Sequence, residues 1–524
     1  MIKQKTIYST GLSLILLLLI SPYTFGRQGT ATDREENKPA VTYITGRLQT
    51  GNPQDTMVLD ILKEFAGSAK TFAVDTTLVQ IMDNGSFKFT PPALDRPVYF
   101  NLQTRFIKGI PYSDWRNHLL ESYMLMPGDS IHIEYLEADK RVAFSGQGAA
   151  RFNWLYETRR QVYQKAASLP EAGVHNNPEQ YLANSDTILN LTLSRLELLA
   201  KEVPANIYRI MKADEIGLYM GNTHMNLSLL DLGAAYKDSA ITRRTIDAYR
   251  SKLYERVADT SSAQLLAASR FYATYLLNKA RAKYKYQRHV GMPHPADFFT
   301  ALKGLRYPGI LKEKMIMAYL YERIAGSALS DQMVSDALAM VNTPRYRHML
   351  LEMKETHGTG QLVADHYVFK DKLDNPVRLS DFKGKVIFID MWFTGCAGCI
   401  AIAKALPEVE REFHGNPNVV FISLSIDKDK AKWMRSIDDS IKPSEGAKKA
   451  PYTHYTTADT KYFYTGGSGA DHPFISKYNP TATFPNLLLL DKGGRIFTSD
   501  VPRPLTQQGK EKLVSLIKEA LNQD

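Results

Sequence analysis

The chain has 524 residues and a mass of 59.1 kDa, which is too long for one hydrophobic core and predicts about three domains. Its hydrophobic content of 44% and charged content of 23% are ordinary for a globular protein. The 65 basic and 55 acidic residues are interspersed, so the net charge of +10 predicts a mildly basic, solvated surface and no nucleic-acid partner.

Residues 1–26 have the pattern of a secretory signal peptide. Lys3 and Lys5 precede an apolar run over residues 12–20, and the small residue Gly26 follows. The run is shorter than the roughly 20 apolar residues that span a bilayer. We therefore expect export to the periplasm or cell envelope, with an uncleaved membrane anchor as the alternative.

Residues 40–148 are predicted to form an antiparallel β-sandwich-like domain. Apolar and polar residues alternate over 41–44 and again over 86–89. The segments 83–85 (Asp-Asn-Gly) and 127–129 (Pro-Gly-Asp) have the composition of tight turns.

Residues 149–355 are predicted to form a central α-helical domain. Leu189, Leu193, Leu196 and Leu199 recur at helical spacing, and similar apolar stripes follow further along the chain. No repeat of fixed length is present. The simplest interpretation of these stripes is a helical core.

Residues 361–524 alternate between strand and helix patterns, which predicts an α/β domain after a Gly-rich linker at 356–360. The segments 386–390, 419–424 and 486–490 are predicted as buried strands. The chain ends in an amphipathic helix with its apolar face on Leu513, Leu516, Ile517 and Leu521.

The chain has two cysteines, Cys396 and Cys399, in a Cys-x-x-Cys motif between a predicted strand and a predicted helix. The macrodipole at the start of a helix favours a thiolate, so we expect Cys396 to be the attacking cysteine. Cys399 lies one helical turn further and would act as the resolving thiol. In an exported protein without other cysteines, such a pair is more consistent with redox chemistry than with structural cross-linking.

Asp390 ends the predicted strand, six residues before Cys396, with apolar residues on both sides. Burial disfavours a charged carboxylate and raises its pKa. Asp390 is therefore our candidate base for deprotonating Cys399, although an acid facing water at a strand end is the alternative.

The residues 389–392 (Ile-Asp-Met-Trp) followed by the Cys-x-x-Cys motif resemble the thioredoxin superfamily, and the layout of residues 361–524 is similar to the TlpA-like exported thiol–disulfide oxidoreductases. The region 41–148 resembles, less specifically, a β-rich domain that often precedes such modules. The resemblance implies a C-terminal α/β thioredoxin fold.

The resemblance also implies roles for single residues. Cys396 matches the nucleophile and Cys399 the resolving thiol, while Asp390 matches the buried acid. The expected substrate-binding residues are Trp392, the aromatic residue near the motif, together with Phe484 and Pro485, whose peptide bond matches the cis-proline that faces the disulfide.

The sequence departs from the family pattern at three places. Gly395 stands where a Trp commonly precedes the first cysteine, and 397–398 (Ala-Gly) replaces Gly-Pro. Pro407 falls later in the helix than is usual. These departures leave the reaction class unchanged and bear on the redox potential.

Other chemistries fit the sequence less well. A structural zinc site needs four ligands, and His414, His454 and His472 would have to supplement the two cysteines without paired spacing. A purely structural disulfide and a peroxidase related to the peroxiredoxins are further alternatives. For the peroxidase, the Thr-x-x-Cys pattern is absent, since Phe393 lies three residues before Cys396.

The sequence thus predicts a multidomain, exported enzyme that works as a disulfide reductase in the periplasm of a Gram-negative cell. It would need no metal and no cofactor beyond the Cys396–Cys399 disulfide. The expected partners are thiol- or disulfide-bearing proteins and a membrane electron donor. The alternative function is an envelope interaction protein whose N-terminal domains bind a partner, with the redox activity secondary.

Overall fold

The computed structural model describes most of the chain after residue 40, with gaps. The described residues are 5–6, 41–48, 56–62, 76–104, 118–136, 141–173, 177–229, 247–250, 252, 262–288, 293–325, 329–363, 365–438, 455, 459–480, 482–498 and 500–523. Apart from Lys5 and Thr6, the predicted signal segment lies outside these residues. Within them, we find no helix that is both long and apolar enough to cross a membrane.

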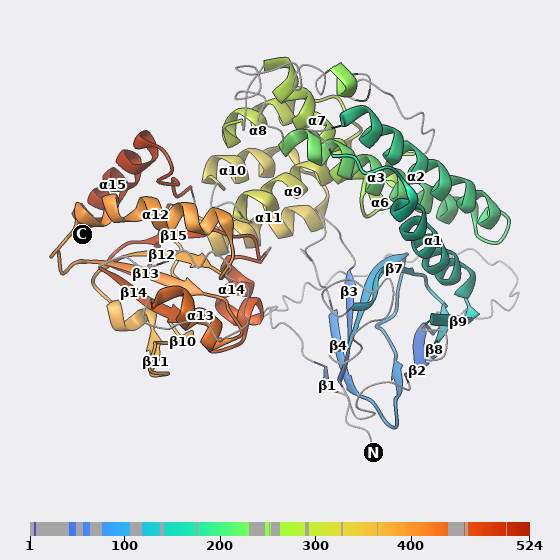
Figure 1. The fold of residues 1–524 in the computed structure, drawn as a ribbon, viewed down its shortest axis with the longest axis horizontal. Helices are drawn as coiled ribbons and strands as arrows, with labels where there is room; N and C mark the ends of the chain where they lie inside the picture. The colour runs from blue at the N-terminus through green and yellow to red at the C-terminus, as the bar shows by residue number, and fades with distance from the viewer. Residues whose placement is uncertain are drawn as a thin grey trace, which may run out of the picture. The chain divides into compact units, whose positions relative to one another are not determined.

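The predicted fold class is confirmed: β-strands come first, helices follow, and a thioredoxin-like arrangement ends the chain (Figure 1). The chain divides into two compact units, one of residues 1–65, 73–172 and 180–215, and one of 66–72, 173–179 and 216–524. This division passes through the helical region. The predicted boundaries at 148, 355 and 361 stay predictions about separate domains.

Two sheets form the β-rich part. The first has the order β1-β4-β3-β6-β7 and the second the order β5-β2-β8-β9. The strands are β1 (Lys5–Thr6), β2 (Tyr43–Arg47), β3 (Thr56–Leu62), β4 (Thr76–Ile81), β5 (Ser86–Phe89), β6 (Val98–Thr104), β7 (His118–Leu125), β8 (Ser130–Leu136) and β9 (Arg141–Gln147).

Residues of both sheets share one hydrophobic core, as a sandwich requires. In β8 every second residue is buried, because successive side chains point to opposite faces of a sheet. The prediction of a purely antiparallel sandwich is wrong in one detail, since β2 and β8 run parallel. The chain between them forms most of the other sheet, and such a long connection permits parallel pairing.

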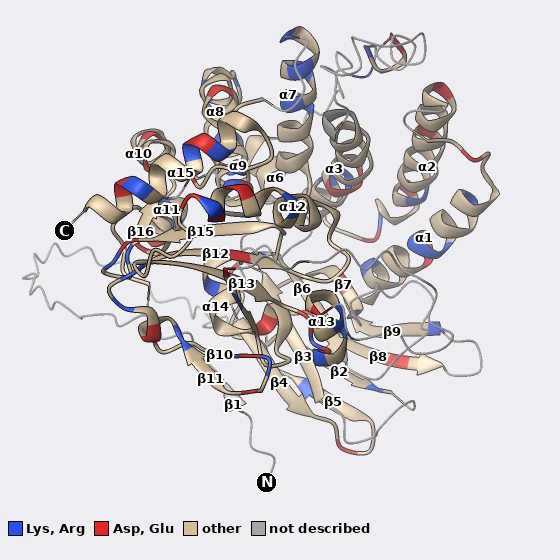
Figure 2. Ribbon diagram, turned by 60° about the vertical axis from the view of Figure 1, so that its left-hand side comes forward, with Lys and Arg blue, Asp and Glu red and all other residues tan. Residues whose placement is uncertain are grey.

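The helical region contains helices of 6 to 25 residues. They are α1 (Ala149–Ser168), α2 (Pro178–Leu199), α3 (Ala205–Leu229), α6 (Ala263–Ala268), α7 (Tyr272–Arg288), α8 (Pro295–Gly304), α9 (Gly309–Ala325), α10 (Asp331–Met340) and α11 (Pro344–His357). Helix α11 continues to His357, so the expected linker is shorter than predicted and begins at Gly358. Basic and acidic residues are distributed over the helices and strands (Figure 2), as their interspersed sequence predicts.

The C-terminal sheet has seven strands in the order β11-β10-β14-β13-β12-β15-β16. The central strand β12 pairs parallel with β13 and antiparallel with β15. The elements are β10 (Val368–Lys370), β11 (Pro376–Arg378), η1 (Leu379–Phe382), β12 (Val386–Trp392), α12 (Ala397–Arg411), β13 (Val419–Ser425), α13 (Lys430–Ile437), β14 (Thr460–Tyr464), η2 (Gly469–Asp471), α14 (Pro473–Tyr478), β15 (Asn486–Leu490), β16 (Ile496–Thr498) and α15 (Gln507–Asn522).

Helices cover both faces of this sheet (Figure 1). One core cluster joins β12, β13 and β15 to α12 and α15. A second cluster joins the other face to α14. Every residue of β12 is buried, which explains why that strand is a continuous apolar run interrupted only by Asp390. The end of this central strand carries the loop to the Cys-x-x-Cys motif.

Candidate redox site

The Cys-x-x-Cys motif lies between the buried strand β12 and helix α12. Cys396 is the N-cap residue of α12, and its Sγ accepts a hydrogen bond from the Cys399 backbone N–H at 3.2 Å. An N-cap side chain that accepts from the third helical residue satisfies one of the free N–H groups of the first turn. The start of the helix therefore holds the Cys396 sulfur among groups that favour a negative charge.

The two cysteines form a disulfide, with their Cα atoms 5.2 Å apart. Cys399 is completely buried, whereas Cys396 keeps 7% of its surface exposed. The residues between them, Ala397 and Gly398, are exposed. Of the two cysteines, only Cys396 therefore keeps any surface that an incoming molecule could contact.

The Phe484–Pro485 peptide bond is cis, as predicted. A Cβ atom placed on Gly398 would lie 3.0 Å from Pro485 Cδ, so the proline ring rests directly on the motif. This contact gives a physical reason for the glycine between the cysteines, because a larger side chain would push the proline loop away. The structure therefore brings Pro485 and the motif together.

Two aromatic side chains stand beside the motif. Phe484 is partly buried, and its ring meets the Phe393 ring edge-to-face with centroids 5.7 Å apart. Phe393 is 36% exposed and lies in the loop that leads from β12 to Cys396. Sequence reasoning did not select Phe393, although an apolar residue next to a reactive cysteine in a loop is a usable signal.

Trp392 departs from its predicted substrate-binding role. Its side chain is fully buried, stacks on Tyr455 with centroids 3.9 Å apart, and donates from Nε1 to Ser423 Oγ at 2.6 Å. It presents no surface to a substrate, because it ends a strand with every residue buried. Trp392 instead packs in one buried cluster with Tyr455 and both cysteines.

Asp390 lies in the centre of the sheet, opposite Ser423 of β13 and Leu487 of β15. The side chain is buried, and its Oδ1 has no hydrogen-bond partner. Burial raises the pKa of this carboxyl to about 7, while the positive charge of Arg503 acts in the opposite direction. A carboxyl with such a pKa exchanges a proton readily at neutral pH. Its role as the base stays a prediction.

A buried acid that sequence reasoning missed holds the loop before Cys396. Asp427 Oδ2 accepts hydrogen bonds from the Thr394 backbone N–H at 3.1 Å, from Thr394 Oγ1 at 2.8 Å and from Ser425 Oγ at 2.8 Å. Thr394 Oγ1 is also 2.7 Å from Ser436 Oγ. Asp427 follows β13, the parallel neighbour of β12, so the meeting of their carboxyl ends was a usable signal.

Tyr455 fastens the same loop from a distant part of the sequence. Its hydroxyl accepts from the Gly395 N–H at 3.3 Å and lies 3.4 Å from the Phe393 carbonyl, to which it donates. Gly395 has a φ of +96°, a conformation that favours glycine over the Trp common at this position in the family. Nothing in the sequence around Tyr455 predicts these contacts.

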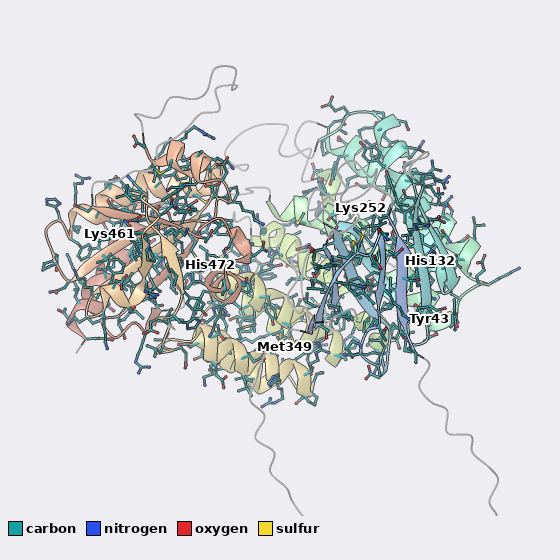
Figure 3. All side chains as sticks on the ribbon, turned by 90° about the horizontal axis from the view of Figure 1, so that it is seen from below. Tyr43, His132, Lys252, Met349, Lys461 and His472 are labelled. Atoms are coloured by element: carbon teal, nitrogen blue, oxygen red, sulfur yellow. A yellow bond between two sulfur atoms is a disulfide. The ribbon has the colours of Figure 1, made fainter. Side chains whose placement is uncertain are left out.

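Among the residues that the structure describes, no three potential metal ligands are grouped. His472, labelled in Figure 3, has Nε2 3.0 Å from the Val368 carbonyl and stacks on Phe369. His414 pairs with Asp459 at 2.8 Å. His454 lies outside the described residues. Neither described histidine is in a group with the cysteines.

Comparison with known proteins agrees with this geometry. Residues 384–496 match the family model described as thioredoxin-like. The C-terminal domain is therefore a thioredoxin-like domain. The matched region contains Asp390, both cysteines and Pro485, and it ends in β16.

Solved structures similar to this chain include proteins described as thiol–disulfide oxidoreductases from Bacteroides species. Two are proposed thiol–disulfide oxidoreductases from Bacteroides vulgatus. The first is 25% identical in sequence, and the match covers 30% of this chain and 96% of the other chain with a TM-score of 0.23. The second is 28% identical, and the match covers 29% of this chain and 87% of the other chain, also with a TM-score of 0.23. A third is the thioredoxin domain of a B. vulgatus thiol–disulfide oxidoreductase. It is 21% identical in sequence, and the match covers 31% of this chain and 98% of the other chain with a TM-score of 0.24.

The prediction of a thiol–disulfide oxidoreductase type of enzyme is confirmed at the level of the domain, which joins a thioredoxin-like fold to a Cys-x-x-Cys disulfide. The similarity to each of these solved structures covers less than a third of this chain. The β-rich part predicted before it is present in the structure.

Proposed function

We propose that this protein is an exported thiol–disulfide oxidoreductase that reduces disulfides of protein substrates. The observation that carries the proposal is the disulfide between Cys396, which keeps a small exposed surface, and the completely buried Cys399 at the start of α12, beside Pro485. The exchange needs no cofactor beyond this pair. The buried carboxyl of Asp390 supplies the proton acceptor.

The first step is attack by Cys396. In the reduced enzyme its thiolate attacks one sulfur of a substrate disulfide, forms a mixed disulfide and releases the other substrate sulfur as a thiolate, which takes up a proton from water. The N-terminal end of α12 favours this thiolate. The exposed Ala397 and Gly398 leave room for the substrate chain.

The second step is resolution by Cys399. Its thiol gives a proton to the Asp390 carboxylate, directly or through a water molecule, and the resulting thiolate attacks the Cys396 sulfur. The Cys396–Cys399 disulfide forms and the second substrate sulfur leaves. Two electrons have then passed from the enzyme dithiol to the substrate, and an external dithiol must reduce the enzyme again.

The activity is tested with the mature chain, residues 27–524, reduced and then mixed with oxidised insulin as a model substrate. Stoichiometric reduction of insulin disulfides by the wild type, and none by Cys396→Ser, is the expected result. An equal rate for both proteins would contradict the proposal. The equilibrium of the Cys396–Cys399 pair with glutathione gives its potential, and a potential above that of the envelope substrates would contradict the reductase direction.

Export and the electron donor are parts of the same proposal. The basic and apolar segments of residues 1–26 support export to the periplasm or cell envelope. There, a membrane protein with a cytoplasmic electron supply is the expected donor of the external dithiol. Cell fractionation tests the location, and trapping of a Cys399→Ser variant in a mixed disulfide with a membrane protein tests the donor.

An envelope interaction protein is the second candidate function. The observation that favours it is that the thioredoxin-like match leaves residues 1–383 unmatched, while the β-rich part has a complete core of its own. A double variant with Ser at both cysteines separates the two functions. If this variant complements a deletion strain and returns it to the wild-type phenotype, binding is the main function. If it does not complement the strain, redox chemistry is the main function.

A further inference from the structure

Arg503 lies in the segment between β16 and α15 and reaches the proline loop of the redox site. Its Nη2 donates a hydrogen bond to the carbonyl oxygen of Pro485 at 3.3 Å. Pro485 in turn rests on Gly398 between the cysteines. Arg503 thus fastens the loop that faces the disulfide, although it lies outside the region that matches the thioredoxin-like family model.

The guanidinium of Arg503 also interacts with Asp390. Asp390 pairs with Leu487 two residues after Pro485, so the proline loop and the carboxyl share one end of the β12–β15 pair. The charge of Arg503 favours the ionised carboxyl, and the carboxylate favours the charged guanidinium in return. Burial has the largest influence on the Asp390 pKa and raises it, and the charge of Arg503 opposes this effect beside an Oδ1 atom that has no hydrogen-bond partner.

Among the described residues, Ser423 and Leu487 flank Asp390 in the sheet and carry no charge. The charge of Asp390 in turn helps to raise the pKa of Tyr455. Arg323 of α9, in the same compact unit, repels Arg503, and its neighbour Ile324 accepts a hydrogen bond from Asn486 Nδ2 at 3.1 Å. Arg503 is therefore the cation that acts directly on Asp390 among the described residues.

We propose that Arg503 is a positioning residue for the resolving step: it holds Pro485 against the motif and keeps the Asp390 carboxyl ready to accept the Cys399 proton at neutral pH. This inference rests on the proposed function, since it assigns a role within the same exchange. A positive charge beside a buried acid lowers its pKa, which keeps a usable fraction of the carboxylate where burial alone would leave the group protonated.

The test compares two substitutions of Arg503. Arg503→Lys keeps a positive charge and a donor, whereas Arg503→Gln keeps a donor without the charge. Infrared difference spectroscopy across a pH titration measures the Asp390 carboxyl in the oxidised protein, with Asp390→Asn as the blank. We expect Arg503→Gln to raise the Asp390 pKa by about one unit or more, and Arg503→Lys to leave it close to the wild type.

The same three proteins are then compared in the rate at which a mixed disulfide on Cys396 is resolved. The pH at which this rate reaches half of its plateau should move upward in Arg503→Gln and stay in place in Arg503→Lys. An unchanged carboxyl titration in Arg503→Gln, or an equal shift in both variants, would overturn the inference. Because the titration needs no turnover, it remains decisive if the protein reduces no substrate.

Discussion

The β-rich part and the thioredoxin-like domain each bury one aspartate near an arginine, and the two acids differ in their hydrogen bonds. Asp129, before β8, accepts from the Met126 N–H at 2.7 Å and forms a buried ion pair with Arg151 of α1. Asp390 has an oxygen without a partner and interacts with Arg503 through charge. Burial raises the pKa of both carboxyls.

The two aspartates differ as a structural carboxyl differs from a reactive one. Asp129 closes the turn before β8 and ties it to α1, because its Oδ2 accepts from the Met126 N–H and pairs with Arg151. Asp390 leaves an oxygen unoccupied in a place where a hydrogen bond would have stabilised the fold. An acid of the second kind, in the buried strand that leads to a Cys-x-x-Cys disulfide, indicates chemistry rather than stability.

The largest expected effect is on the redox region itself. Cys396→Ser should abolish disulfide reduction, whereas Cys399→Ser should still attack and then accumulate mixed disulfides through Cys396, because the resolving thiol is missing. Mass spectrometry of the trapped species checks both outcomes. Faster alkylation of Cys399 than of Cys396 in the reduced protein would contradict the assignment of the two roles.

The two aspartates should respond in opposite directions to the same substitution. Asp129→Asn leaves Arg151 buried without its ion-pair partner and should destabilise the β-rich part by about 3–5 kcal/mol. Asp390→Asn removes a poorly solvated charge and should stabilise the thioredoxin-like domain by roughly 1–3 kcal/mol at pH 8.

Hydrogen exchange measures the two effects separately, since a chain of several units does not unfold in one step. Protection of β8 and β9 should fall in Asp129→Asn, and protection of β12 should rise in Asp390→Asn. Leu136→Ala, at an exposed position of β8, is a control that should change neither. Destabilisation by both aspartate substitutions would remove the distinction between the acids.

The stability of the thioredoxin-like domain should fall as the pH rises from 4 to 7. In this window the folded domain holds a proton on Asp390, with its pKa raised to about 7 by burial, and the unfolded chain does not. Each such proton contributes a slope of about 1.4 kcal/mol per pH unit. Denaturant unfolding at several pH values should show that the free energy of unfolding depends less steeply on pH in Asp390→Asn than in the wild type. Equal slopes in the two proteins would exclude Asp390 as the cause.

The smallest expected effect concerns the aromatic pair beside the motif. Phe393→Ala removes the partly exposed ring that meets Phe484 and should weaken substrate binding by about 1 kcal/mol, or roughly fivefold. Phe393→Leu, which keeps an apolar contact, should lose less. The KM for a disulfide substrate checks this, and an unchanged KM in the alanine variant would show that Phe393 does not contact the substrate.

The sequence was sufficient where a local pattern determined the structure. The buried strand β12, the cysteines at the start of α12 and the cis bond before Pro485 all followed from residue types at fixed spacing or from family resemblance. The burial of Asp390 followed from its apolar neighbours, because a residue in a central strand cannot reach water.

The sequence was insufficient where distant segments meet. Three separate segments of the chain bring Tyr455, Asp427 and Arg503 to the redox site. The periodicity of the sequence does not indicate which of these segments contact one another. The burial of Trp392 was missed for a related reason, since the stacking ring of Tyr455 comes from far along the chain. The parallel pairing of β2 with β8 likewise depends on the whole intervening sheet.

The most direct test of the central claim, that Asp390 accepts the proton of Cys399, is the pH dependence of the resolving step. Stopped-flow measurement would follow the decay of a mixed disulfide between Cys396 and a chromogenic thiol in the wild type and in Asp390→Asn. In the wild type the rate should rise through the Asp390 pKa of about 7 and then level off. In Asp390→Asn the rate at pH 7 should fall about 10²-fold, and the rise of the rate near pH 7 should disappear from the pH profile. The same profile in both proteins would contradict the account.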